Sequence, residues 1–350
     1  MIILGGYMKK RLFALFIISM LACMTLLGCV SVENDSEPSD TSEVSNTKVV
    51  LNEVAHSIFY APMYVAIENG YFAEEGIDLE LVTGFGADKV MTALISGEAQ
   101  IGFMGSEASI YAYNEGANDY AVNFAQLTQR AGNFLVARED MSDFNWQDLK
   151  DTYVLGGRKG GMPQMVFEYI LKENNINPDS DLEINQSIDF GSTAAAFAEG
   201  QGDFTVEFEP HATALETEEK GYVVASLGKD SGYVPYTAFS AKQSYIKENP
   251  QIIQGFTNAL QKGMDYVQSH TPAEIASVIQ PQFKETDLNT ITTIISRYYE
   301  QDTWKSDLIF TEESFDLLQD ILESAGELKE RAPYGDLVNT DFAKKSADQF

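Results

Sequence analysis

The chain has 350 residues, of which 44% are hydrophobic, and a formal net charge of −30. The length suits two domains of ordinary size, and the apolar content is enough for a full core. Such a charge argues against a nucleic-acid partner, whose phosphates would be repelled, and against a broad basic contact with anionic lipid. It is typical of a surface kept soluble and monomeric by self-repulsion, with steering of a cationic ligand as the alternative.

Cysteine and histidine are scarce, which limits the chemistry of the chain. Cys23 and Cys29 both lie near the N-terminus, so the remaining sequence has no disulfide, thiolate metal site or thiol nucleophile. His56, His211 and His270 stand apart, without metal-ligand spacing. We therefore expect neither a metal nor a cofactor.

The N-terminal segment has the features of an export signal. Residues 9–11 are basic, and residues 12–27 form a mostly apolar run of 16 residues, shorter than the roughly 20 that span a bilayer. The sequence Leu26-Leu27-Gly28-Cys29 resembles a lipobox, which implies cleavage before Cys29 and attachment of acyl chains such as palmitate. A plain signal peptide or an uncleaved anchor is the alternative. Residues 30–47 are polar and acidic, which predicts a flexible tether.

From residue 48 onward, predicted strands and helices alternate. Strands are expected at 48–55, 78–83, 100–104 and 122–127, with helices at about 61–70, 88–96 and 107–113 between them. A second series begins with strands at 133–136 and 152–156, and continues through helices at 164–174 and 194–199 and strands at 182–188, 202–208 and 222–226. This alternation predicts two mostly parallel sheets with helices on their faces.

The last third of the chain predicts helices alone after one more strand. Residues 234–240 form a strand that we expect to return to the first lobe. Helices are expected at 251–268, 272–279, 287–301, 312–324 and 341–348. The predicted organisation is a signal peptide at 1–29, a tether at 30–47, a first lobe at 48–132 with 234–350, and a second lobe at 133–233.

Three stretches carry a family resemblance: FYAPMYVAIENGYFAEEGIDLELV from residue 59, GADKVMTALISGEAQIGFMGSEASI from residue 86, and RKGGMPQMVFEYIL from residue 158. The region from about 49 to 257 resembles substrate-binding proteins of ABC importers, in the group that binds nitrate, alkanesulfonates, taurine and thiamine-pyrimidine precursors. The resemblance implies an α/β fold of the two-lobed type II periplasmic-binding-protein kind with C-terminal helices. It further implies a lipid-anchored receptor on the outer face of the cell membrane that captures a small molecule and delivers it to an ABC permease with its ATPase.

Ligands of open α/β sheets bind at the carboxyl ends of strands, where loops meet helix N-termini. Thirteen candidate ligand-binding residues fall at these places: His56, Phe59, Tyr60, Phe85, Gly86, Ser106, Lys159, Gly160, Gly161, Met162, Phe190, Glu207 and Glu209. The loop aromatics would form a stacking wall, or pack beneath their loops. Ser106 and the glycine-rich loop would present backbone N–H donors, or serve only as a helix cap and a tight turn. A triad of Ser106, His56 and Asp88 lacks the G-x-S-x-G elbow, so we predict no catalysis.

Two ligand classes remain open at this stage. The first is a small nitrogenous heterocycle resembling a thiamine-pyrimidine precursor, stacked between Phe59 or Tyr60 and Phe190 and oriented by Glu207 or Glu209. The second is an alkanesulfonate, taurine or nitrate-type anion, held by backbone N–H groups at Ser106 and Gly160-Gly161. A carboxylate facing the cleft would favour the heterocycle, because a carboxylate accepts hydrogen bonds from amino and ring N–H groups.

Overall fold

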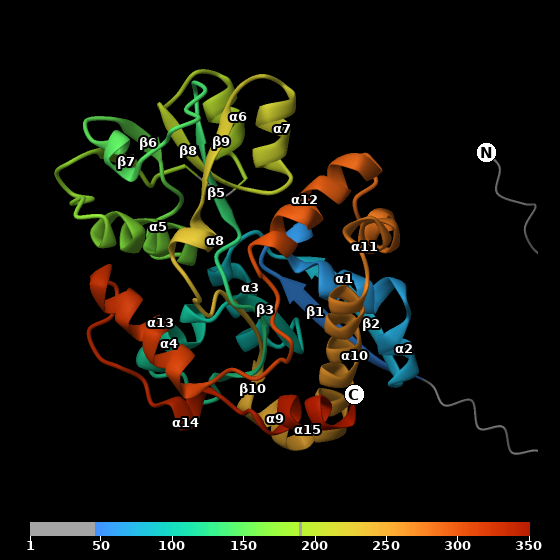
Figure 1. Cartoon of the computed structure of the whole chain (residues 1–350). Coiled ribbons are helices and arrows are strands. Elements are labelled where there is room, and N and C mark those ends of the chain that lie inside the picture. Colours follow the sequence, from blue (N-terminus) through green and yellow to red (C-terminus); the bar gives the residue numbers. More distant parts are fainter. Residues whose placement is uncertain (1–45, 189–190) are drawn as a thin grey trace, which may run out of the picture. The chain divides into compact units, whose positions relative to one another are not determined.

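The computed structural model describes residues 46–188 and 191–350 (Figure 1). The predicted signal peptide, the lipidation site at Cys29, nearly all of the tether and Phe190 lie outside the described residues.

The first five-stranded sheet has the order β2-β1-β3-β10-β4. Alternating or wholly apolar runs form its strands, as expected for half-buried and fully buried positions. They are β1 (Thr47–Glu53), β2 (Ile77–Thr83), β3 (Ile101–Gly105), β4 (Ala121–Thr128) and β10 (Thr237–Lys242). We call the part of the molecule built around this sheet the first lobe.

The second five-stranded sheet has the order β7-β6-β8-β5-β9, and the part built around it is the second lobe. Its strands are β5 (Asn133–Ala137), β6 (Tyr153–Leu155), β7 (Glu183–Asn185), β8 (Phe204–Phe208) and β9 (Tyr222–Ser226). The chain passes from the first sheet to the second between β4 and β5, and returns between β9 and β10 (Figure 1).

Four of the five strands in each sheet run in the same direction, as the sequence predicts, and one strand in each sheet runs against them. β1 pairs in parallel with β2 and β3, but β10 runs antiparallel to both β3 and β4. In the second sheet β6 is parallel to β7 and β8, whereas β5 is antiparallel to β8 and β9. The strands that reverse direction are those at which the chain enters the other lobe, β5 and β10, and no βαβ crossover fixes their direction.

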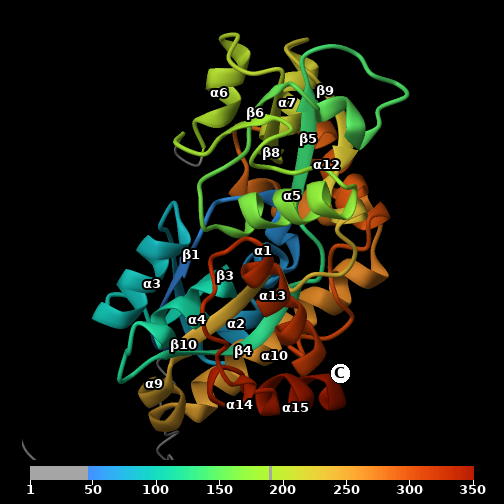
Figure 2. The same ribbon diagram turned by 90° about the vertical axis from the view of Figure 1, so that its left-hand side faces the viewer.

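Helices connect many of the strands and pack on the sheets. In the first lobe they are η1 (Ile58–Tyr60), α1 (Ala61–Glu68), α2 (Tyr71–Glu74), α3 (Ala87–Ser96) and α4 (Glu107–Asn114). In the second lobe they are η2 (Trp146–Leu149), α5 (Met162–Glu173), α6 (Thr193–Ala198), α7 (His211–Thr217) and α8 (Leu227–Asp230). Figure 2 shows α5 between the second sheet and the helices of the first lobe.

The C-terminal third is helical, as predicted. It consists of α9 (Gln243–Glu248), α10 (Pro250–Ser269), α11 (Pro272–Ile279), η3 (Gln280–Gln282), α12 (Leu288–Glu300), α13 (Glu312–Ser324), α14 (Tyr334–Leu337) and α15 (Asp341–Gln349). The apolar face of α10, with Phe256, Leu260 and Met264, is fully buried and packs on α1. α12 and α13 instead reach the seam between the lobes, where α13 packs on α5. Within the described part of the chain, no helix has both the length and the apolar character needed to cross a bilayer.

Candidate functional site

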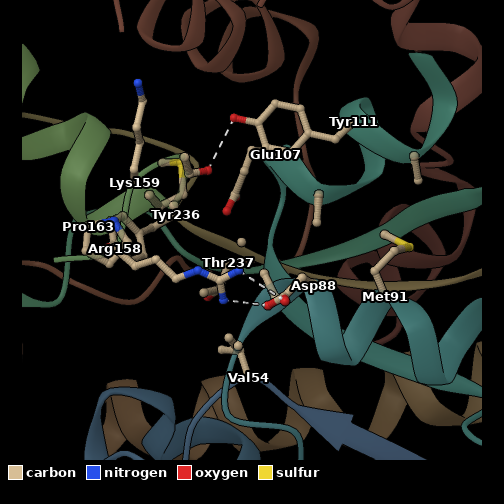
Figure 3. A pocket seen from close by; sticks show the side chains of 18 of the residues that line it. Val54, Asp88, Met91, Glu107, Tyr111, Arg158, Lys159, Pro163, Tyr236 and Thr237 are labelled. Carbon is tan, nitrogen blue, oxygen red and sulfur yellow. Dashed lines mark hydrogen bonds and ion pairs between the residues drawn. The ribbon is translucent and has the colours of Figure 1, made fainter. Parts of the chain in front are cut away.

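A cavity of about 410 Å³ lies at the seam between the lobes (Figure 3). This volume falls in the range of about 300–1,000 Å³ typical of small-molecule sites. The first lobe contributes the starts of α3 and α4, and the second lobe contributes the loop from β6 to α5 and the end of β8. The residues that line the cavity include Tyr60, Asp88, Glu107, Tyr111, Arg158, Lys159, Met162, Phe208 and Tyr236.

Glu107 is the acidic residue at the centre of this cavity. β3 ends at Gly105 and α4 begins at Glu107, so the side chain emerges where a strand end meets a helix N-terminus. Gly105 is required for this placement, because a Cβ on it would stand 2.1 Å from Glu107 Oε2. Figure 3 shows the carboxylate directed into the space between Tyr111, Tyr236 and the Asp88–Arg158 pair.

The Glu107 carboxyl group is short of hydrogen-bond partners. The residue is buried, and its Oε2 atom has no hydrogen-bond partner within the described part of the protein. Burial raises its pKa to about 7, against the opposing effect of the backbone N–H groups of Glu107 itself and of Met162. A buried carboxylate oxygen without a donor is costly. The site is therefore complementary to a ligand that presents an N–H group or a positive charge.

Aromatic rings surround the carboxyl group. Tyr60 lies edge-on to Phe103, with the ring centres 4.6 Å apart. The Tyr236 hydroxyl donates to Asn133 Oδ1, and the Tyr111 hydroxyl donates to the Gly160 carbonyl at 3.3 Å. Burial raises the pKa of all three tyrosines, so their hydroxyl groups are neutral near pH 7. Rigid aromatic walls of this kind suit a planar ligand.

Charged side chains pair across the seam at the rim of the cavity. Arg158 Nη1 and Nη2 donate to Asp88 Oδ1 and Oδ2 at 3.0 and 3.2 Å, which joins the β6–α5 loop to the start of α3. Lys159 Nζ lies 3.8 Å from Glu327 Oε1, beyond the end of α13. Hydrogen bonding to Arg158 lowers the pKa of Asp88. The rim thus already contains paired charges from opposite lobes.

Six of the thirteen residues proposed from the sequence line this cavity: Tyr60, Gly86, Lys159, Gly160, Gly161 and Met162. Gly86 has a φ of 142°, and a Cβ there would stand 2.8 Å from Asp88 Oδ1. Gly160 has a φ of 81°, which favours glycine. The glycine-rich loop therefore brings the N-terminus of α5 to the cavity.

Three other proposed residues lie away from the cavity lining. Phe59 is fully buried and packs on Phe208, Tyr236 and Tyr298. Ser106 is buried, and its hydroxyl donates to the Pro235 carbonyl at 2.8 Å. Phe85 is 60% exposed, with a φ of 56°.

His56, Glu207 and Glu209 line a second, smaller cavity of about 50 Å³ between the lobes. Glu209 accepts from Arg297 Nη1 at 2.8 Å and from the Thr213 backbone N–H at 2.8 Å, so its charge is compensated within the protein. Glu207 accepts from the Thr205 hydroxyl at 2.6 Å, and burial raises its pKa to about 7. These two carboxylates are held by neighbouring side chains, whereas Glu107 is not.

Asp88, Glu107, Tyr111, Arg158 and Tyr236 line the site but were not among the residues proposed from the sequence. The sequence contained a feature that could have identified Glu107, because this residue follows Ser106 at a predicted strand-to-helix corner. No sequence feature could have identified Tyr236, because it lies in the segment that returns to the first lobe. Only the folded chain brings that segment to the seam. Among the described residues, no cluster of three or more His, Cys, Asp or Glu side chains is able to hold a metal ion.

Comparison with known families identifies the group to which the chain belongs. The family model described as NMT1/THI5 like matches residues 58–275. The chain belongs to this family.

Two curated relatives and one solved structure illustrate the similarity. "Putative binding protein YtlA" of Bacillus subtilis (strain 168) is 47% identical over 303 residues, which cover 87% of this chain and 91% of the relative. The formylaminopyrimidine-binding protein of Halalkalibacterium halodurans is 23% identical over 265 residues, which cover 74% and 76%. The alkanesulfonate-binding protein SsuA of Xanthomonas axonopodis pv. citri, bound to MOPS, superposes with a TM-score of 0.69 at 14% identity, covering 84% of this chain and 98% of that one. The last comparison supports the two-lobed fold.

Proposed function

We propose that this protein is the extracytoplasmic receptor of an ABC importer and that it captures a small nitrogenous heterocycle of the aminopyrimidine kind. The observation that carries the ligand class is the Glu107 carboxyl group, buried at the lobe seam with Oε2 unpartnered among the described residues. An amino group or a protonated ring nitrogen would donate to this oxygen. The formylaminopyrimidine-binding relative supports the same class.

The cavity provides the remaining contacts that such a ligand needs. Tyr60 and Tyr236 offer faces and edges for a planar ring, and Phe208 adds apolar surface from the second lobe. In this proposal Glu107 takes the orienting role that the sequence suggested for Glu207 or Glu209. Because the ligand would touch both lobes, it would stabilise the closed arrangement. The closed protein would then dock on a permease, whose ATPase drives transport.

The proposal includes capture without catalysis and attachment to the membrane through an acyl chain on Cys29. Residues 48–132 with 234–350, and residues 133–233, are the proposed lobes. The strand content of the two sheets supports this division, although α12 also forms ion pairs with the second lobe through Arg297.

The rival ligand, an alkanesulfonate or nitrate-type anion, is favoured by one observation. The N-terminus of α5, with Lys159 beside it, lies on the cavity, and helix N-termini attract anions. The same N–H region already faces the Glu107 carboxyl group, since the Met162 backbone N–H stabilises its charged form. An anion would therefore bind only while Glu107 keeps a proton, and its binding should weaken as the pH rises above the Glu107 pKa of about 7.

A thermal-shift screen distinguishes the two ligand classes. A bound ligand at a hundred times its Kd stabilises a protein by about 2.7 kcal/mol, which is readily seen as a rise in Tm. We expect formylaminopyrimidine and related aminopyrimidines to raise the Tm, and taurine, alkanesulfonates and nitrate to leave it unchanged. A rise with the sulfonates and none with the pyrimidines would refute the proposed ligand class.

A further inference from the structure

Given the proposed function, the ligand-free seam must accommodate its central acid without a ligand beside it. Among the described residues, three buried acids line the two cavities at the seam, and their hydrogen-bond partners differ. Glu209 has the Arg297 guanidinium, and Glu207 has the Thr205 hydroxyl. Glu107 has neither a cationic side chain nor a hydroxyl donor on its Oε2 atom within the described residues.

The groups around Glu107 supply no compensating charge. Tyr60 from η1, Tyr111 from α4 and Tyr236 from the returning segment are neutral and buried or half-buried. The Met162 backbone N–H faces it from the second lobe. Of the charged residues that line the cavity, Arg158 binds Asp88, Lys159 lies 3.8 Å from Glu327, and Glu115 is a further acid.

A bare carboxylate in such surroundings is unstable. Removing an ionised carboxylate from water without a partner is so costly that the group takes up a proton instead. The Glu107 carboxyl group lies directly against Gly105, since a Cβ on Gly105 would collide with both carboxyl oxygens. This close contact with the strand end keeps the Glu107 side chain within the seam.

We propose that Glu107 carries a proton while the seam cavity is empty, and that an N–H donor of the captured ligand takes the place of that proton. On binding, the carboxyl O–H bond breaks, the proton passes to solvent buffer, and the resulting carboxylate accepts a hydrogen bond from the ligand. Capture of a neutral aminopyrimidine is then accompanied by proton release. Burial, which raises the pKa of Glu107 to about 7, agrees with this arrangement.

Glu207 provides a matched control. It is also buried with its pKa raised to about 7, but it lines the other cavity and accepts from Thr205. Glu207→Gln removes this second buried carboxyl group with a raised pKa, and it alters no residue that lines the proposed ligand cavity. Glu107→Gln removes the proposed group and retains its shape.

The experiment is infrared difference spectroscopy of protonated carboxyl groups at about pH 6, on the full chain with the Glu207→Gln substitution. We expect a protonated-carboxyl band in the ligand-free protein that is absent from the Glu107→Gln, Glu207→Gln double variant. Adding formylaminopyrimidine should abolish the band. Calorimetry in buffers of different ionisation enthalpy should show release of about one proton per bound probe.

Two results would overturn the inference. The first is a ligand-free spectrum with no band that depends on Glu107. The second is a band that persists after a Tm rise has shown that formylaminopyrimidine is bound, because Glu107 would then act as a proton donor to the ligand. A probe that fails to raise the Tm refutes the pyrimidine class of the proposed function, and the ligand-free spectra still decide the protonation of Glu107.

Discussion

At the scale of single residues, neighbouring groups decide what each buried acid can do. Glu53, at the end of β1, is fully buried and accepts from the Tyr64 hydroxyl at 2.6 Å and the Thr83 hydroxyl at 2.9 Å. His56 Nδ1 lies 2.9 Å from Glu53 Oε1, and Nε2 lies 2.9 Å from the Gln282 carbonyl. With an acceptor at each ring nitrogen, the imidazolium form is the one that satisfies both contacts.

This arrangement predicts a pH-dependent contribution to stability from His56. Burial disfavours its charged form, but hydrogen bonds to Glu53 and to the Gln282 carbonyl outweigh burial and raise its pKa above 6.5. A raised pKa contributes stability that is fully present below 6.5 and is lost as the pH rises through the folded-state value. In thermal melts, His56→Gln should lower the Tm in acid and lose this effect in alkali. A Tm difference that is the same at every pH would contradict the assignment.

The identity of the site residues was only partly predictable at this scale. Tyr60 and Phe59 are adjacent in sequence, yet one lines the cavity and the other packs in the core, because η1 turns the chain between them. Ser106 and Glu107 are also adjacent, and the sequence indicated the serine as the site residue. The Ser106 hydroxyl instead donates to the Pro235 carbonyl, and the glutamate side chain lines the cavity. The sequence pattern locates the corner where a strand ends and a helix begins. It does not decide which of two neighbouring side chains at that corner faces the ligand.

At the scale of elements, α12 and the β6–α5 loop join the lobes. Arg297 on α12 binds Glu209 after β8 and Glu216 on α7, so a C-terminal helix is fastened to the second lobe. The β6–α5 loop contacts the first lobe through Arg158 and Gly160. The sequence predicted both elements, because helical periodicity and a run of glycines are local signals. Their cross-lobe contacts were not predictable, because their partners lie far away along the chain.

Loss of Arg297 should strongly destabilise the fold. Removing one partner of a buried ion pair leaves an uncompensated charge and costs about 3–5 kcal/mol, and the partial exposure of Arg297 places the expected loss for Arg297→Ala at the lower end of this range. Arg331→Ala is the matched control, since Arg331 pairs with Asp320 and Glu323 at the surface and its loss should cost less than about 1 kcal/mol. Urea unfolding measures both. Equal losses for the two variants would argue against a buried role for Glu209.

The Asp88–Arg158 pair should affect how long a ligand stays bound. The pair spans the rim from opposite lobes, and both side chains are about half exposed. Exposed pairs contribute roughly 0.2–1 kcal/mol, so Asp88→Asn should speed dissociation about 1.4- to 5-fold. Stopped-flow release of formylaminopyrimidine measures this rate. Glu80→Gln, which breaks the exposed Lys48–Glu80 pair away from the seam, should leave it unchanged. An equal acceleration in both variants would show that the Asp88–Arg158 pair does not itself slow ligand release.

At the scale of the whole molecule, the two-lobed plan was predictable and the direction of its joining strands was not. Alternating strands and helices specify α/β lobes, and the purely helical end of the sequence specifies the covering helices. β5 and β10 reverse direction because the chain enters each lobe from the other. The cavity at the seam is lined by residues drawn from between 54 and 237 along the chain. Its chemistry therefore depends on how both lobes fold together.

The measurement that tests the central claim most directly is calorimetric titration of formylaminopyrimidine and of taurine into the wild-type protein and Glu107→Gln. We predict that the wild type binds the pyrimidine and not taurine. Replacing the carboxylate removes a charge-assisted hydrogen bond worth about 1.5–3 kcal/mol, so Glu107→Gln should bind the pyrimidine roughly 10- to 100-fold more weakly. Tight binding of taurine, or equal pyrimidine affinity in the two proteins, would contradict capture of an N–H donor by Glu107.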